Sequence, residues 1–500
     1  MNKKLLFFAK GQRKRGSPDG QIIVMDKSEL SNGGMSEHTK RINEVAAVLS
    51  AAKRLHFAGA GGISMSSLAL WAKGRGYLVS GSDRSPSALT EMLEKNGIAV
   101  AIGQRAENVD GADAVIYSVA LHPDNPELVA AVGQGIPCLT RAEFLGYMMS
   151  FYRVRIGISG THGKSTTTAM ISHILLDAGV DPTVACGAVM PELNGASRIG
   201  ADHNIFVYEA CEYRDSFLSF CPTDAVITNV ELDHTDYFAD IDQIIGSFGK
   251  SIENASTVYI NADNGGARRA IARFGGKIVT VSLSDPTADY SAADLVYRHG
   301  CGCYTLLHKG EPVCDISLPL IGGFNVYNSL CAAAVCLEHS VSPALIASSL
   351  QSFGGVARRF EHKGERDGVA VYDDYAHHPD EVLATLRSLP SLGYKHMYLV
   401  FQPHTYTRTH DLWDRWVAAF NEAKELSVKV ILADIYAARE TDDLGVSSEK
   451  LAKECGALWL PDFESINSYL KENAKAGDLI LTMGAGQAYI AGELFLGRKK

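Results

Sequence analysis

From residue 51 onwards, the chain alternates short apolar and β-branched runs with longer segments whose apolar residues recur at helical spacing. This alternation is typical of parallel sheets covered by helices, so it predicts an α/β fold. A chain of 500 residues suits about three domains of roughly 150 residues each. We expect these domains at 46–150, 151–352 and 353–500. The predicted strands are 54–58, 77–80, 114–118 and 136–139 in the first block, 153–159, 205–210, 225–229, 258–260 and 277–282 in the second, and 369–373, 398–401, 430–434 and 479–482 in the third.

The charge and cysteine content argue against several classes of protein. Asp and Glu number 57 against 47 Lys and Arg, a formal charge of −10 that runs through the chain rather than forming a tail. Without a basic stripe there is little electrostatic attraction to nucleic acid, so we expect no such partner. The ten cysteines form no CxxC pair, which favours free thiols over a disulfide framework or a zinc site. Free thiols suit a reducing compartment, and we expect a cytoplasmic protein.

The first residues imitate the start of a signal peptide, with two lysines followed by the apolar run 5–9. That run is too short for a signal peptide, and basic residues return at once. No later segment reaches the roughly 18 apolar residues that a membrane span needs. We therefore expect residues 1–45 to be a disordered tail, and we expect no membrane partner.

The sharpest local signal is Gly160-Thr-His-Gly-Lys-Ser-Thr-Thr167, which directly follows one predicted strand and opens a helical pattern. In such a turn, the backbone amides and the helix N-terminus converge on phosphate oxygens. Lys164 adds a positive charge, and the Ser165 hydroxyl can bind magnesium. The glycines enclose two residues rather than the four of a standard P-loop, so this is a shorter variant. The competing interpretation is a turn that serves packing alone.

Acidic side chains follow two other predicted strands. Glu209 and Glu212 come at the end of one strand, and Asp233, His234 and Asp236 follow the next. The carboxyl ends of parallel strands form the ligand-binding edge of an open sheet. Carboxylate oxygens suit the Mg²⁺ that accompanies ATP, whereas histidine is a less usual ligand for it. Either cluster alone is explained by solvated strand ends, but together beside a phosphate loop they predict a magnesium site.

These features resemble those of the Mur ligases, over about residues 51–490. The motifs that carry the resemblance are His56-Phe-Ala-Gly-Ala-Gly-Gly62, Ser80-Gly-Ser-Asp83, residues 160–167 and 229–237, Phe353-Gly-Gly-Val-Ala-Arg-Arg-Phe360, Asp373-Asp-Tyr-Ala-His-His-Pro379, Gln402-Pro-His404, Tyr406-Thr-Arg408, Asp434-Ile-Tyr-Ala-Ala438 and Met483-Gly-Ala-Gly486. The resemblance implies a Rossmann-like first domain, a P-loop-type central ATPase domain and a Rossmann-like third domain. It also implies an ATP-dependent amide ligase of peptidoglycan precursor synthesis that uses ATP and Mg²⁺. The motifs are most similar to those of members that join L-alanine to UDP-N-acetylmuramate.

The resemblance assigns roles in the central and third blocks. The implied ATP-binding residues are Gly160, Thr161, His162, Gly163, Lys164, Ser165, Thr166, Asn325, Asn328, Arg359 and Asp373, and the implied metal ligands are Ser165, Glu209 and His234. Arg358 is expected to reach the phosphates beside Arg359. Phe324 stands where the family has a histidine, so no ring nitrogen is assigned there.

The first block carries a rival interpretation. Gly59-x-Gly61-x-x-Ser64, with Asp83 near the end of the next strand, resembles a dinucleotide fingerprint whose third glycine is absent. The resemblance to Mur ligases implies instead that this turn holds the diphosphate of a UDP-sugar. The implied contacts are Gly59, Gly61, Gly62, Asp83 and Ser118.

The third block is expected to hold the amino acid, and the implied residues are Tyr375, His378 and Arg408. The planar fork of Arg408 can pair both oxygens of a carboxylate. We interpret 404–408 as an extended segment in which His404, Tyr406 and Arg408 share one face, while Thr405 replaces an arginine common in the family. The amine proton goes to His378 or to a carboxylate, but a histidine in a His-His-Pro turn is often only a helix cap.

The implied chemistry explains these residue types. A carboxylate is a poor electrophile, so ATP must first convert it to an acyl phosphate, with Lys164, the arginines and Mg²⁺ neutralising charge. We expect the third domain to swing in when nucleotide binds. Three alternatives stay open: a related ligase that takes a tripeptide, an NAD-dependent dehydrogenase that uses the first block, and a non-catalytic nucleotide-binding partner.

Overall fold

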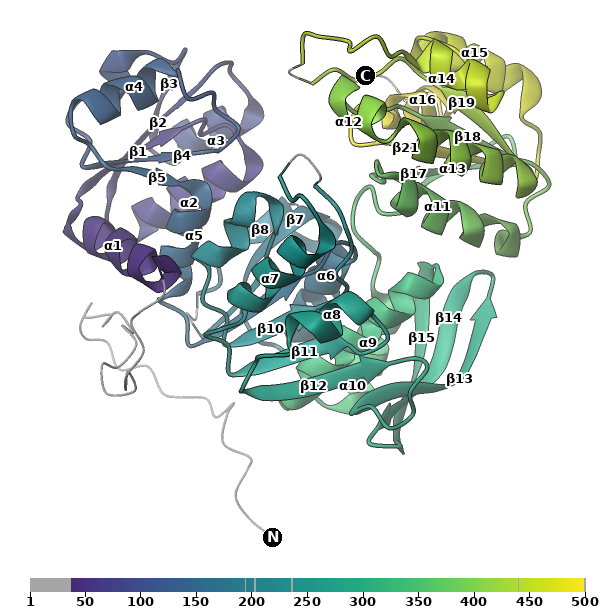
Figure 1. Ribbon diagram of the computed structural model, residues 1–500, viewed down its shortest axis with the longest axis horizontal. Helices are drawn as coiled ribbons and strands as arrows, with labels where there is room; N and C mark the ends of the chain where they lie inside the picture. The colour runs from purple at the N-terminus through teal and green to yellow at the C-terminus, as the bar shows by residue number, and fades with distance from the viewer. Residues whose placement is uncertain (1–36, 194, 202–203, 235–236, 439, 499–500) are drawn as a thin grey trace.

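The computed structural model describes residues 37–193, 195–201, 204–234, 237–438 and 440–498. They form three α/β bodies in chain order, with the central body between the other two (Figure 1). The α/β prediction is confirmed. No helix in the described ranges is both long and apolar enough to cross a membrane.

The first body is a five-stranded parallel sheet in the order β3-β2-β1-β4-β5. Its strands are β1 Arg54–Ala58, β2 Leu78–Asp83, β3 Ala99–Ile102, β4 Ala114–Tyr117 and β5 Cys138–Thr140. Its helices are α1 Glu37–Ala51, α2 Ile63–Gly74, α3 Ala88–Lys95, η2 Ala106–Val109, α4 Pro126–Gly133 and α5 Arg141–Met149. The edge strand β3 was not predicted from the sequence.

Helix α1 corrects the expectation of a tail up to residue 45. Residues 37–45 are part of this helix, and its Val45 and Leu49 are buried in the apolar core shared with the first sheet. These two apolar residues lie four apart, so they face the same side of a helix and hold it on the body. Residues 1–36, the rest of the expected tail, lie outside the described residues.

The central body has a ten-stranded sheet in the order β15-β14-β13-β12-β11-β10-β6-β9-β7-β8. Its strands are β6 Val154–Ser159, β7 Thr183–Met190, β8 Gly195–Arg198, β9 Ile205–Glu209, β10 Asp224–Ile227, β11 Thr257–Asn261, β12 Lys277–Ser282, β13 Tyr290–Arg298, β14 Cys301–His308 and β15 Glu311–Ile321. Its helices are α6 Lys164–Asp177, η3 Pro191–Leu193, η4 Tyr213–Ser219, α7 Ile241–Ser251, α8 Gly265–Ala270, α9 Gly323–Glu338 and α10 Pro343–Ser352. β13, β14 and β15 form an antiparallel meander, which corrects the expectation of parallel strands throughout.

The third body has a six-stranded sheet in the order β16-β17-β21-β18-β19-β20, parallel except for the edge strand β16. Its strands are β16 Glu361–Arg366, β17 Val369–Asp374, β18 Met397–Phe401, β19 Val428–Leu432, β20 Leu458–Trp459 and β21 Leu479–Met483. Its helices are α11 Pro379–Ser388, η5 Leu389–Leu392, α12 Tyr406–Asp411, α13 Trp413–Glu425, α14 Ser448–Cys455, α15 Phe463–Asn473 and α16 Tyr489–Phe495. Separate apolar clusters cover the two faces of the sheet.

The strand order of the central sheet positions the functional residues. β6 lies between β10 and β9, so the turn after β6 is flanked by the residues that follow its two neighbours. All three strands are parallel, and their carboxyl ends therefore meet at one edge of the sheet.

Candidate active site

The turn after β6 requires glycine at two positions. Gly160 has φ 143°, and a Cβ there would lie 1.9 Å from Oγ1 of Thr228. Gly163 has φ 84°, and a Cβ there would lie 2.5 Å from Oδ1 of Asn328. Asn229 braces the turn by accepting the backbone N–H of His162 at 2.8 Å. The turn thus delivers its backbone to the start of α6 in a geometry suited to binding phosphate.

Lys164 opens α6 and lies beneath this turn. Its Nζ donates to the carbonyls of Gly160 and Thr161 at 2.6 and 3.1 Å, and it pairs with Oε1 of Glu212 at 3.0 Å. Burial alone would lower the pKa of Lys164, but nearby Glu212, Cys211 and Glu209 outweigh it and raise that pKa. Lys164 is therefore a cation at pH 7, held where phosphate would accumulate negative charge.

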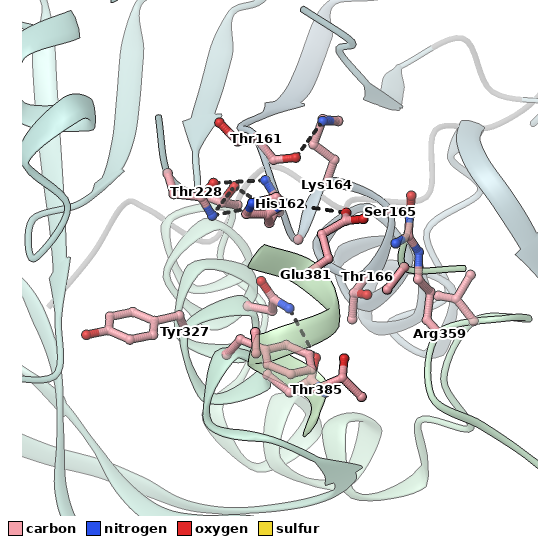
Figure 2. Close-up of a pocket in the computed structure, with 18 of the residues that line it drawn as sticks. Thr161, His162, Lys164, Ser165, Thr166, Thr228, Tyr327, Arg359, Glu381 and Thr385 are labelled. Carbon is pink, nitrogen blue, oxygen red and sulfur yellow. Dashed lines mark hydrogen bonds and ion pairs between the residues drawn. The ribbon is translucent and has the colours of Figure 1, made fainter. Parts of the chain in front are cut away.

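A cavity of about 320 Å³ lies between the central and third bodies; we call it the first cavity. Most of the predicted ATP-binding residues line it: Thr161, His162, Gly163, Lys164, Ser165, Thr166, Asn325, Asn328 and Arg359. Figure 2 shows Glu381 reaching from the third body toward His162. Phe324 and Tyr327 add aromatic surface to the wall, which a purine base could stack on. Tyr327 was not predicted from the sequence.

Asp373, which the resemblance assigned to the nucleotide, is not among the residues that line this cavity. Its fully buried carboxylate pairs with Nε of Arg358 at 2.9 Å and accepts a hydrogen bond from Thr482 at 2.7 Å. The next residue, Asp374, lines the cavity instead, because successive side chains of a strand point to opposite faces. Arg358 is also turned inward, donating to the carbonyl of Gly484 at 2.6 Å, so Arg359 alone of the two arginines lines the cavity.

The predicted metal ligands fall into two neighbouring groups. Oγ of Ser165 donates to Oε2 of Glu209 at 2.7 Å, and the same oxygen accepts the N–H of Gly187 at 2.9 Å. His234 lies in the other group, its Nε2 3.5 Å from Oε1 of Glu212. Asp236, which the sequence placed in the same cluster, lies outside the described residues.

Glu212, Asp233 and His234 offer ligand atoms that all lie within 4.8 Å of one another. Oε2 of Glu212 is buried and has no hydrogen-bond partner among the described residues, so it is an oxygen that a cation could satisfy. A hydroxyl and carboxylates are the donors that Mg²⁺ prefers, and the residues fit that ion. Glu212 and Asp233 were in the acidic clusters that predicted a magnesium site, although the ligand set implied by the resemblance did not include them.

A second cavity, also of about 320 Å³, lies on the other side of this acidic group. Its lining residues come from the central and third bodies: Tyr213, Asp233, His234, His378, His404, Thr405, Thr407, Arg408, Asp411, Leu412 and Glu440. Two of the three predicted amino-acid contacts, His378 and Arg408, are therefore in this cavity. Tyr375 is not, because its ring lies against the guanidinium groups of Arg358 and Arg359 at 4.9 and 5.6 Å.

The segment around Arg408 is helical, which corrects the expectation of an extended strand-like face. Thr405 caps α12, its Oγ1 accepting the N–H of Arg408 at 3.4 Å, and the carboxylate of Glu440 accepts the N–H of Thr407 at 3.0 Å. The helical repeat explains why Thr407, Arg408 and Asp411 line the cavity while Tyr406 does not.

His378 caps α11, as the competing interpretation of this residue allowed. Its Nδ1 accepts the N–H of Asp380 at 3.4 Å, so the proton of a neutral ring lies on Nε2. Burial lowers the pKa of His378, with Asp233 opposing the shift. His404, in the same cavity, is also neutral at pH 7, because burial, together with His377 and Arg408, lowers its pKa to about 4.

The predicted UDP-sugar residues surround the turn between β1 and α2. Gly59 has φ 80°, and Gly62 is the N-terminal cap of α2. The N–H of Gly61 donates to Oδ2 of Asp83 at 2.8 Å, and a Cβ at Gly61 would lie 2.7 Å from that oxygen. Ser118 follows β4 in the same sheet, and its hydroxyl accepts the N–H of Ala120 at 3.3 Å. The helix start and the glycine turn suit an anion such as a diphosphate.

Three family models match the chain in consecutive segments. Residues 54–153 match the Mur ligase family catalytic domain, 158–336 the Mur ligase middle domain, and 358–486 the Mur ligase glutamate ligase domain. The chain belongs to the Mur ligase family. The ATP dependence of Mur ligases agrees with the phosphate loop and the first cavity.

Individual Mur ligases are similar to this chain over most of its length. A UDP-N-acetylmuramate:L-alanine ligase of Lachnospira eligens is 46% identical over 451 residues, which cover 88% of this chain and 97% of the relative. The enzyme of the same name from Acetivibrio thermocellus is 44% identical over 458 residues, 90% of this chain and 96% of the relative. Among solved structures, the UDP-N-acetylmuramate-alanine ligase of Thermotoga maritima matches with a TM-score of 0.74 and 25% identity, covering 89% of this chain and 98% of that one.

Proposed function

We infer that this chain is an ATP-dependent UDP-N-acetylmuramate:L-alanine ligase of peptidoglycan precursor synthesis. The curated relatives with this activity match almost their whole length, which supports the assignment. The observation that carries the chemistry is the position of Glu212. Its Oε1 lies 3.0 Å from Nζ of Lys164, which lines the first cavity, and 3.5 Å from Nε2 of His234, which lines the second.

The two cavities suit two successive reactions. In the first, an oxygen of the lactyl carboxylate attacks the γ-phosphorus of ATP, forming a carboxyl–phosphate bond while the bond to the β-phosphate oxygen breaks and ADP leaves. Lys164 and Arg359 line the first cavity and would offset the charge that spreads over the phosphoryl oxygens. Bound Mg²⁺ would supply further charge neutralisation, held by Ser165, Glu209, Glu212, Asp233 and His234.

In the second reaction, the neutral amine of L-alanine attacks the acyl carbon. The carbon–nitrogen bond forms, phosphate leaves with the electron pair of the carbon–oxygen bond, and the amine loses a proton. Arg408 is placed to orient the amino-acid carboxylate in the second cavity. His378 and the carboxylate of Asp233 line the same cavity as candidate proton acceptors.

A phosphate-release assay tests the proposed function. ATP should yield phosphate only when UDP-N-acetylmuramate and L-alanine are both present, and the product should gain the mass of one alanyl residue. Replacing alanine with a tripeptide separates this activity from that of the related tripeptide ligase. Release with tripeptide and none with alanine would overturn the assignment.

A further inference from the structure

Arg141 lies between the first and central bodies, at the first residue of α5. Its Nη1 donates to Oγ of Ser64 at 3.1 Å. Ser64 belongs to the first turn of α2, directly after the glycine turn, at the position where the dinucleotide fingerprint has its third glycine. The serine therefore contributes a hydroxyl that orients an arginine.

The face of α2 that carries Ser64 is turned toward the central body. Ser67, three residues further along this helix, contacts Ser197 of β8 with the two hydroxyl oxygens 2.5 Å apart. Residues three apart lie on the same side of a helix, so Ser64 and its partner Arg141 also face the central body.

Charges of the central body act on the Arg141 guanidinium. Burial lowers the pKa of Arg141, and Cys211 and Glu209 oppose that shift. Within the described ranges, Arg141 has no carboxylate at ion-pairing distance, and the one side chain it hydrogen-bonds is neutral. Arg141 is half-buried, and its one hydrogen bond to Ser64 leaves four N–H groups of the guanidinium available to pair with an anion.

We propose that Arg141 binds the lactyl carboxylate of the sugar nucleotide. It would orient this carboxylate away from the glycine turn of the first body and toward Glu209 and the phosphate loop. This inference rests on the proposed function. The amides at the start of α2 already suit the diphosphate, whereas Arg141 lies on the side toward the central body, where the reacting carboxylate must go. A guanidinium pairs both oxygens of a carboxylate and fixes its direction, so Arg141 is a substrate-positioning residue.

Binding titrations without ATP test the proposal with two ligands. UDP-N-acetylmuramate carries the lactyl carboxylate, and UDP-N-acetylglucosamine has the same nucleotide and diphosphate but lacks it. Arg141→Ala should weaken binding of the first ligand by about tenfold to a hundredfold and change binding of the second by less than about twofold. Arg141→Lys keeps the charge without the fork, so it should restore only part of the loss.

Two controls make the result specific. Arg273→Ala removes one charge from an exposed position on the central body and should change neither titration. Ser64→Ala removes the hydroxyl that orients Arg141 and should weaken binding of UDP-N-acetylmuramate selectively, but by less than Arg141→Ala does. Equal losses for both ligands would place Arg141 on the diphosphate and overturn the proposal, as would no loss for either. Failure of the wild-type protein to bind UDP-N-acetylmuramate would instead contradict the proposed function.

Discussion

Nδ1 of His162 in the phosphate loop lies 3.4 Å from Oε1 of Glu381 in the third body. Burial would lower the pKa of His162, but Glu381 outweighs it and raises that pKa. Burial would likewise raise the pKa of Glu381, but His162 and His377 hold that pKa well below its usual range. This ion pair joins the two bodies that enclose the first cavity.

The pair predicts a pH-dependent affinity for ATP. Because the pKa of His162 is raised in the folded protein, the stabilising free energy of its positive charge is fully present below pH 6.5. It is lost as pH rises through the folded-state pKa of His162. Because the pKa of Glu381 is lowered, the stabilising free energy of its negative charge is fully present above pH 4.5. It is lost only as pH falls through the folded-state pKa of Glu381. Both charges of the ion pair are therefore present between pH 4.5 and pH 6.5. As His162 loses its proton at higher pH, the wild-type KM for ATP should rise severalfold.

Glu381→Gln tests this dependence, because glutamine can still cap α11 but cannot form the ion pair. Its KM for ATP should already be raised at pH 6.5 and should change little up to pH 9. Glu425→Gln makes the same charge change at an exposed position of the third body and should behave as wild type. Parallel pH curves for wild type and Glu381→Gln would exclude a role for the pair.

The neighbouring residues Asp373 and Asp374 should respond differently to the same substitution. Asp374→Asn acts in the first cavity and should raise the KM for ATP more than Asp373→Asn does. Asp373→Asn removes the charge that pairs with Arg358 and should cost roughly 1–3 kcal/mol of stability, because it weakens a buried charge-assisted hydrogen bond. Thermal unfolding and ATP kinetics on both variants check this, and the opposite assignment of effects would contradict the structure.

Asp373 and Asp374 also show which part of the site the sequence does not predict. The motif Asp373-Asp374 located the right strand end, but adjacent side chains of a strand face opposite sides. Which side faces the nucleotide depends on how the sheet packs, and the motif does not contain that information. The glycine turn was predicted more fully, because its glycines, lysine and serine are consecutive in sequence.

The secondary structure, like the site, was predicted from the sequence only in part. The predicted strands at 54–58 and 277–282 coincide with β1 and β12, and the run Ile278-Val-Thr-Val281 of β12 is rich in β-branched residues, which favour strands. The meander of β13 to β15 was missed. In β14, burial alternates along the strand, but the sequence Cys301-Gly-Cys-Tyr-Thr-Leu-Leu-His308 does not alternate apolar with polar side chains. Helix α12 was missed because part of its capping comes from Glu440, which is far away in sequence and adjacent only after folding.

Glu209→Gln should lower the rate steeply while the protein stays folded. Glutamine keeps the volume of the side chain but removes the charge that Ser165 and the N–H of Gly187 face. If Glu209 binds magnesium, added Mg²⁺ should restore part of the activity, which a titration of the rate against Mg²⁺ would measure. Glu311→Gln, at an exposed hairpin position, is the matched control. Full activity of Glu209→Gln at low Mg²⁺ would remove this residue from the site.

Arg408→Ala should raise the KM for L-alanine by about tenfold to a hundredfold, the effect of losing a charge-assisted hydrogen bond of roughly 1.5–3 kcal/mol. The constants for ATP and UDP-N-acetylmuramate should stay within a few fold, because the second cavity is separate from the first. Arg387→Ala removes a charge that pairs with Glu422 on the surface of the same body and should leave all three constants unchanged. Equal losses for all three substrates in Arg408→Ala would indicate a misplaced third body instead.

Activation of the carboxylate as an acyl phosphate is the central claim, and transfer of labelled oxygen tests it most directly. UDP-N-acetylmuramate labelled with ¹⁸O in the lactyl carboxylate is incubated with ATP and L-alanine, and the released phosphate is examined by mass spectrometry. The acyl phosphate route transfers one carboxylate oxygen to each phosphate, so the phosphate should carry one ¹⁸O. Unlabelled phosphate would contradict the account. The carboxylate oxygen lost on amide formation would then be found in AMP, as an acyl adenylate requires, or in solvent.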